Sequence, residues 1–196
     1  MQKLVTPMCI QDNFFSKRRS VMAKKMSSNP INAEDLNAIL LEGIRVPDHG
    51  ALSPWKLTVI QGSALKKLDE EVILAEFIKK KTDSEKSTQE IESKRLQRAG
   101  AIIVVLSTPV DHPSIPLWEM QLSSGAVCMN LLSSAQSKGY AAQWLTEWYS
   151  YNEKMLVTLG GRVGIDKISG FIYIGRKKEE PLERKRPDPK NIINYL

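Results

Sequence analysis

The chain has 196 residues, of which 42% are apolar, and it carries a formal net charge of +6. This length suits a single domain, 1–196, and is too short for two ordinary domains and a linker. No apolar run could cross a membrane and the amino terminus lacks a signal-peptide core, so we expect a soluble cytoplasmic protein without a membrane partner. Cys9 and Cys128 have neither metal-ligand nor CxxC spacing, which disfavours metal chemistry and disulfides.

The basic residues do not gather into one stripe. Residues 79–98 interleave lysines and arginines with acidic residues, as a solvated or mobile surface helix would, and the basic cluster 176–186 is diluted by glutamates. The aromatic residues lie in apolar segments rather than on a charged platform. We therefore expect no nucleic-acid partner, although a basic binding module stays a minor alternative.

Apolar periodicity predicts helices that alternate with strands. The predicted helices are one that ends near 17, one capped by Asn32 that runs to 44, one that follows Gly62, one over 116–138 and one over 153–159. The predicted strands are 56–61, 101–106, 140–146 and 168–175. Helices that follow strands indicate a layered domain containing both.

Four segments carry more specific expectations. Residues 101–106 are continuously apolar, which is typical of a strand buried on both faces at the centre of a sheet. Ser150 and Glu153 have the spacing of a capping box. The long helix 116–138 is apolar on more than one face, which suits either a central helix or a subunit interface. Residues 184–196 are expected to form an extended arm with an apolar end.

Residues 45–55 form a stiff loop between a predicted helix and a predicted strand. The loop combines Arg45, Asp48 and His49 with two prolines and a glycine, so it could present donors to an anion. The structural alternative is that Asp48 pairs with Arg45, His49 caps a carbonyl and Trp55 fills the core.

Arg18, Arg19 and Ser20 form a second candidate anion site. Two arginines beside a hydroxyl suit a phosphate, although a basic, exposed helix end explains them equally. The chain has no glycine-rich dinucleotide turn, no P-loop and no nucleophile elbow, so any phosphate would be held by side chains.

Four motifs in order resemble those of the flavin-dependent nitroreductase superfamily, in its branch of small single-domain members. They are Arg18-Arg19-Ser20, the Arg-x-Pro-Asp-His and Pro-Trp signature within 45–55, the strand 140–146 with its tryptophan, and the final strand 168–175 followed by 184–188. The resemblance implies an α+β nitroreductase-like fold, with a central mixed β-sheet flanked by helices and a long core or interface helix.

The resemblance also implies an activity. It suggests an FMN-dependent NAD(P)H oxidoreductase with ping-pong transfer to an electron-poor acceptor such as a nitroaromatic or quinone, working as a homodimer with shared sites. The residues it assigns to FMN are Arg18, Arg19, Ser20, Arg45, His49, Trp144, Leu145 and Thr146. It assigns Ser134, Ala135, Gln136, Ser137, Lys138 and Gly139 to the nicotinamide, although helix packing and a helix end explain this segment as well.

Two residues depart from the family pattern. Ser53 stands where many relatives have glutamine, and Leu145 stands where close relatives have arginine, which removes a positive charge from the pocket. These changes affect substrate choice more than flavin binding. A flavin-binding or flavin-storage protein without productive turnover would keep the same motifs and stays an alternative.

Overall fold

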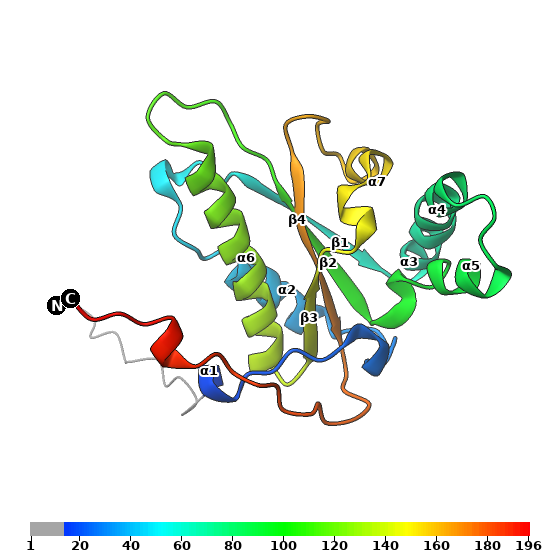
Figure 1. The fold of residues 1–196 in the computed structure, drawn as a ribbon, viewed down its shortest axis with the longest axis horizontal. Helices are drawn as coiled ribbons and strands as arrows, with labels where there is room; N and C mark the ends of the chain where they lie inside the picture. Colours follow the sequence, from blue (N-terminus) through cyan, green and yellow to red (C-terminus); the bar gives the residue numbers. More distant parts are fainter. Residues whose placement is uncertain (1–13) are drawn as a thin grey trace.

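The computed structural model describes residues 14–196, which build one four-stranded sheet with helices on both faces (Figure 1). The strands are β1 (Trp55–Gln61), β2 (Ala101–Ser107), β3 (Ala141–Leu145) and β4 (Lys167–Gly175). Their order across the sheet is β1-β2-β4-β3, so the apolar strand β2 is an inner strand, as expected, beside β4. Cys9 lies outside the described residues.

The strand pairing corrects one expectation. The α+β layering is confirmed, but the sheet is not mixed among the described strands, because all three neighbouring pairs run antiparallel. Every residue of β2 is buried, a pattern common in parallel strands, yet helical layers on both faces produce the same burial in an antiparallel sheet. The burial of β2 therefore indicates that helices cover both faces of the sheet, and it does not indicate whether the strands run parallel or antiparallel.

One face of the sheet carries α2 (Ala33–Gly43) and α6 (Leu117–Ser137). The side chain of Asn32 caps α2 as predicted, accepting hydrogen bonds from the backbone N–H groups of residues 34 and 35. The two helices approach closely at Gly43, where a Cβ would lie only 2.2 Å from Cδ2 of Leu131. Helix α6 buries residues such as Val127 and Leu131 against the sheet, so it is the central helix of its own chain.

The buried face of α6 includes Cys128. Burial raises the pKa of this thiol to about 12, so it behaves as a small apolar side chain.

No helix within residues 14–196 is long and apolar enough to cross a membrane.

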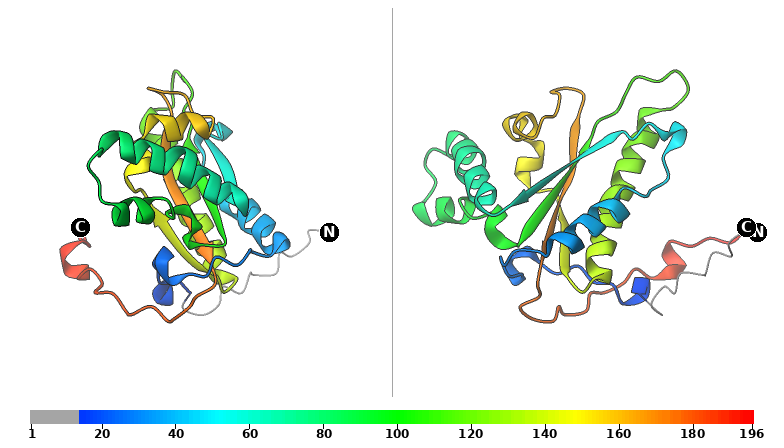
Figure 2. Two further views of the ribbon diagram at one scale, coloured as in Figure 1. Left: turned by 90° about the vertical axis from the view of Figure 1, so that its right-hand side faces the viewer. Right: turned by 180° about the vertical axis from the view of Figure 1, so that it is seen from behind.

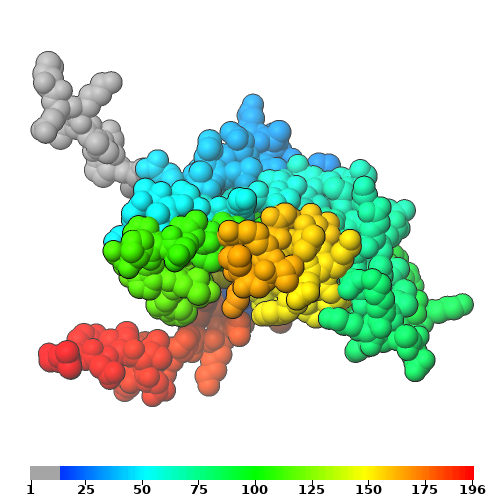
Figure 3. Space-filling model, turned by 90° about the horizontal axis from the view of Figure 1, so that it is seen from above, coloured from blue at the N-terminus to red at the C-terminus, as the bar shows by residue number. Residues whose placement is uncertain are grey.

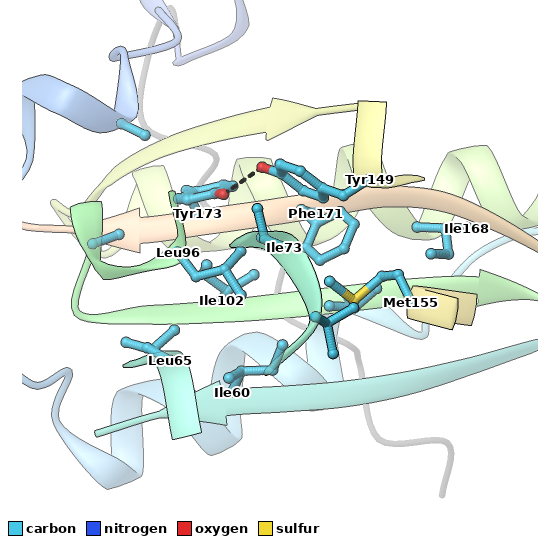
Figure 4. Packing of buried hydrophobic residues seen from close by; sticks show 14 of the residues in the cluster. Ile60, Leu65, Ile73, Leu96, Ile102, Tyr149, Met155, Ile168, Phe171 and Tyr173 are labelled. Atoms are coloured by element: carbon cyan, nitrogen blue, oxygen red, sulfur yellow. Dashed lines mark hydrogen bonds between the residues drawn. The ribbon is translucent and has the colours of Figure 1, made fainter. Parts of the chain in front are cut away.

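The other face carries a more broken helical layer. Helix α3 (Ser63–Leu68) continues through a π-helical turn (Asp69–Leu74) into α4 (Ala75–Lys80), and α5 (Lys86–Glu92) and α7 (Glu153–Thr158) complete the layer. Its core centres on Tyr149, which lies edge-on to Phe171 at 4.9 Å between ring centroids and shares a 2.7 Å hydrogen bond with the hydroxyl of Tyr173 (Figure 4). Thus the sheet has two separate apolar cores.

Short elements complete the chain. They are α1 (Phe14–Lys17) and the 3-10 helices Ala23–Lys25, His49–Ala51, Leu96–Arg98, Trp148–Tyr151 and Pro189–Asn191. After β4 the chain runs along the bottom of the sheet and then stands away from the body as an arm (Figures 2 and 3). Leu182 and Tyr195 on this arm are 83% and 91% exposed.

The cap of α7 differs from the expected capping box. The Asn152 side chain accepts the backbone N–H of Met155 at 2.9 Å and donates to Glu76 at 3.2 Å. Ser150 lies two residues before Asn152, within a 3-10 helix, and its buried hydroxyl has no partner among the described residues. The predicted capping box is wrong because Trp148–Tyr151 forms a helical turn of its own. Helix α7 therefore begins at Glu153, with Asn152 as its N-cap.

We predict that Asn152→Ala lowers the free energy of unfolding by about 1–2 kcal/mol, because the helix loses its cap. The control, Ser150→Ala, removes a hydroxyl without a partner and should change stability by less than about 0.5 kcal/mol. Urea denaturation followed by circular dichroism measures both. A larger loss of stability from Ser150→Ala than from Asn152→Ala would instead support the predicted capping box.

Candidate functional site

Helix α6 holds the loop 45–55 from two positions along its length. Its Ser123 hydroxyl donates to the carbonyl of Pro47 at 2.7 Å, and its Asn130 side chain donates to the carbonyl of Arg45 at 2.8 Å. These bonds fix the loop backbone and leave the Arg45 side chain exposed. Helix α6 therefore positions the loop through neutral side chains that bind its backbone.

The backbone of this loop is strained. Gly50, Ala51 and Ser53 all have positive φ, of 71°, 52° and 47°. For residues other than glycine such a conformation costs about 1–3 kcal/mol, and it persists only where surrounding contacts impose it. Here the Asp48 carboxylate accepts the backbone N–H of Ser53 at 2.7 Å, and Ile115 is buried beneath Gly50. Strain of this kind is concentrated at functional sites.

The structural alternative for the loop is only partly right. Asp48 binds the backbone of Ser53 rather than Arg45, and His49 Nδ1 lies 2.6 Å from a carboxylate oxygen of Glu119 rather than against a carbonyl. Trp55 does pack, half-buried, against the core beneath α6. The loop and the start of α6 together line a cavity of about 350 Å³.

Arg18 and Arg19 lie at the opposite end of α6. The Gln136 side chain donates to the carbonyl of Arg19 at 2.8 Å, and Nε of Arg19 donates to the carbonyl of Leu182 at 3.1 Å. The carbonyl of Ser20 accepts a 3.3 Å bond from Arg19. The segment thus lies between the end of α6 and the chain that leaves β4.

A cavity of about 230 Å³ opens beside these arginines. Its lining is mostly basic and polar: Phe14, Lys17, Arg18, Arg19, Val21, Gln136, Gly139, Tyr140, Lys177, Glu180 and Pro181. Nη1 of Arg18 is buried with no hydrogen-bond partner among residues 14–196. Burial, and then the nearby Arg186 and Arg19, lower the pKa of Arg18. A guanidinium nitrogen that is buried beside other cations is suited to bind an anion.

The strand residues 144–146 divide between the two faces of the sheet. Trp144 lies on the α6 side, donates from Nε1 to the carbonyl of Ser169 at 3.0 Å, and covers Gly170, where a Cβ would lie 2.0 Å from that nitrogen. Leu145 points into the opposite core, because side chains alternate along a strand. Thr146 is exposed just beyond β3. A ligand on the α6 side of the sheet could therefore contact only the backbone of Leu145.

Most of the segment 134–139 serves the fold. Ser134 and Lys138 both bind the carboxylate of Glu42, with Lys138 at 2.8 Å, and these bonds lower the pKa of Glu42. Ala135 is fully buried, and the Ser137 hydroxyl donates to the carbonyl of Ser134. Gly139, with φ of 82°, follows the helix end and, with Gln136, lines the arginine cavity.

A comparison with known families decides the assignment. The model described as "Nitroreductase family" matches residues 15–176. The chain belongs to the nitroreductase family. It is 27% identical over 184 residues to "Putative NAD(P)H nitroreductase YdjA" of Escherichia coli (strain K12), covering 91% of this chain and 95% of that protein. A Haemophilus influenzae protein with the same NAD(P)H nitroreductase description is 26% identical over 176 residues, with 88% and 93% covered.

Solved structures agree on the nitroreductase fold. A nitroreductase-like family protein from Bacillus cereus superposes with a TM-score of 0.80 at 23% identity, over 94% of each chain. A nitroreductase with bound FMN from Bacteroides fragilis superposes with a TM-score of 0.67 at 21% identity, over 94% of this chain and 97% of that one. The expected family and fold are confirmed.

The arginine cavity and the loop cavity share no lining residue among the described residues. On α6, Gln136 binds the arginine segment, while Glu119 and Asn130 bind the loop. Gln136 is 17 positions from Glu119 and six positions from Asn130, or about 25 Å and about 9 Å at 1.5 Å per residue. The sequence interpretation also missed Glu119, Ser123 and Asn130. Their only signal was that they are polar positions on a largely apolar helix.

The contact beneath Gly50 generates a prediction about the loop. A Cβ at Gly50 would lie 2.7 Å from Cδ1 of the buried Ile115, whereas Gly164, with similar φ of 77°, has nothing within 4 Å. Gly50→Ala should therefore lower the free energy of unfolding by about 1–3 kcal/mol more than Gly164→Ala, since both incur the cost of positive φ and only one crowds a core residue. Thermal or urea unfolding measures the difference. Equal losses of stability in the two variants would show that the loop and Ile115 move apart at no cost.

Proposed function

We propose that this protein is an FMN-dependent NAD(P)H oxidoreductase of the nitroreductase type. Membership of the family carries the oxidoreductase class and the FMN cofactor. The ping-pong order, an electron-poor acceptor such as a nitroaromatic or quinone, and a cytoplasmic location are parts of the proposal. The observation that carries it is the buried Nη1 of Arg18, which has no partner among the described residues and lies beside a cavity lined with cations.

The arginine cavity suits the phosphate end of FMN. Arg18 and Arg19 supply guanidinium donors, Lys17 adds positive charge, and Ser20 follows directly in the chain. Lys177 is paired with Glu180 of the same lining at 2.7 Å. The buried Oε1 of Gln136 also has no partner among the described residues, so it could accept a hydroxyl of the ribityl chain. A volume of about 230 Å³ is below the roughly 300–1,000 Å³ usual for a whole ligand, so this cavity would hold only one end.

The loop residues suit the ring end. Arg45 would offset negative charge on the reduced flavin, His49 would hydrogen-bond to the cofactor, and the 38% exposed ring of Trp144 would offer an apolar surface. Bound FMN would supply the redox chemistry by carrying two electrons from NAD(P)H to the acceptor. For the proposed nicotinamide segment 134–139, the support rests on Gln136 and Gly139, which line a cavity.

We further propose a homodimer in which each FMN site is shared between chains. The arginine cavity and the loop cavity share no lining residue among the described residues, which supports a site that a second chain completes. Trp118 at the start of α6 is 66% exposed, and Leu117 and Leu122 are exposed beside it. With the exposed apolar residues of the arm, they offer the surface that a subunit interface needs.

The test of the function is an absorption and reduction experiment. The purified protein should be yellow or take up one FMN per chain, and NADPH or NADH under anaerobic conditions should bleach the flavin. A quinone added next should restore the oxidised spectrum. A flavin-storage protein would bind FMN without bleaching, whereas a protein that takes up no FMN would defeat the proposal.

The shared site can be tested by complementation. Arg18→Ala and Arg45→Ala chains should each bind FMN weakly as homodimers. Random mixing should restore full affinity at about one site in four, because half of the dimers then contain one site with both arginines. FMN fluorescence quenching measures the tight fraction. If mixing restores no sites, or light scattering detects an FMN-loaded monomer, the shared arrangement is wrong.

A further inference from the structure

The contact between His49 and Glu119 belongs to the loop cavity. Nδ1 of His49 and a carboxylate oxygen of Glu119 are 2.6 Å apart, and both residues line the 350 Å³ cavity. Their side chains are 62% and 44% exposed. The pair is thus open to a ligand and is not part of a core.

The loop does not need this pair for its position. Ser123 and Asn130 already hold two of its carbonyls, and Ile115 packs beneath Gly50. An exposed ion pair adds at most about 1 kcal/mol to stability. Asp48, the other carboxylate lining the cavity, accepts the backbone N–H of Ser53. The main effect of Glu119 therefore falls on the imidazole ring itself.

A carboxylate can only accept a hydrogen bond, so the ring nitrogen that faces it must carry the proton. We propose that Glu119 is a positioning residue that holds His49 in its Nδ1–H tautomer. The neutral ring then presents an unprotonated Nε2, on its opposite edge, to an N–H or O–H donor of a ligand. This inference rests on the proposed function, because the flavin ring and the ribityl chain supply such donors.

The second histidine provides an internal reference. Nδ1 of His112 accepts the backbone N–H groups of Ser114 at 3.2 Å and Ile115 at 3.1 Å. The neutral His112 ring must therefore carry its proton on Nε2. The chain has only two histidines, so nitrogen NMR of the labelled protein should resolve two rings with opposite tautomers.

The first readout is this tautomer, recorded at alkaline pH without added flavin. Glu119→Ala should move His49 away from the Nδ1–H form and leave His112 unchanged, whereas Glu119→Asp should retain it. The control is Glu153→Ala, because Glu153 also lies in the first turn of its helix but does not line the loop cavity. An unchanged His49 tautomer in Glu119→Ala would overturn the inference.

The second readout is FMN affinity by fluorescence quenching. Glu119→Ala should weaken binding about two- to tenfold, the effect of one hydrogen bond, and Glu119→Asp should recover most of it. In a His49→Ala background, Glu119→Ala should have no further effect. An equal loss with and without His49 would show that Glu119 acts by charge alone and would overturn the inference. Failure of wild-type protein to bind FMN would instead overturn the proposed function, while the tautomer result would stand.

Discussion

Helix α6 is the constraint on which the rest of the structure depends. It packs on the sheet through a continuous buried face, and Ser124 shares a 2.7 Å hydrogen bond with Ser169 of β4. Because a helix of 21 residues is rigid, it fixes the separation of whatever its two ends hold. Ser123 and Asn130 hold the strained loop, and Gln136 in the last turn holds the arginine segment. The helix therefore sets the spacing of the two segments that we propose bind FMN.

Neutral side chains of α6 do most of this holding. Ser123, Asn130 and Gln136 each donate to a backbone carbonyl of a neighbouring segment. Such bonds position a loop without using its side chains, which stay available to a ligand. This explains how Arg45 stays exposed and how Arg18 keeps a buried nitrogen without a partner among the described residues.

The two ends of α6 differ in charge. The arginine cavity gathers Lys17, Arg18 and Arg19 beside a Lys177–Glu180 ion pair, whereas the loop cavity contains the carboxylates of Asp48 and Glu119. This difference supports the proposal that the phosphate of FMN binds at the first cavity and its ring at the second. The net charge of +6 therefore says little about partners until the positions of the charges are known.

The sequence by itself determined the elements and the candidate residues. Periodicity, the Asn32 cap and Gly139 located the helices, because these signals are local and act within a few residues. It could not determine the strand direction of the apolar β2, because burial on both faces is the same for either direction. Only the tertiary structure decided that Glu119 faces His49, that Asn130 binds the carbonyl of Arg45 and that Gln136 binds the carbonyl of Arg19. Each of these depends on segments brought together by packing, and a single sequence carries no information on which distant polar side chains will meet.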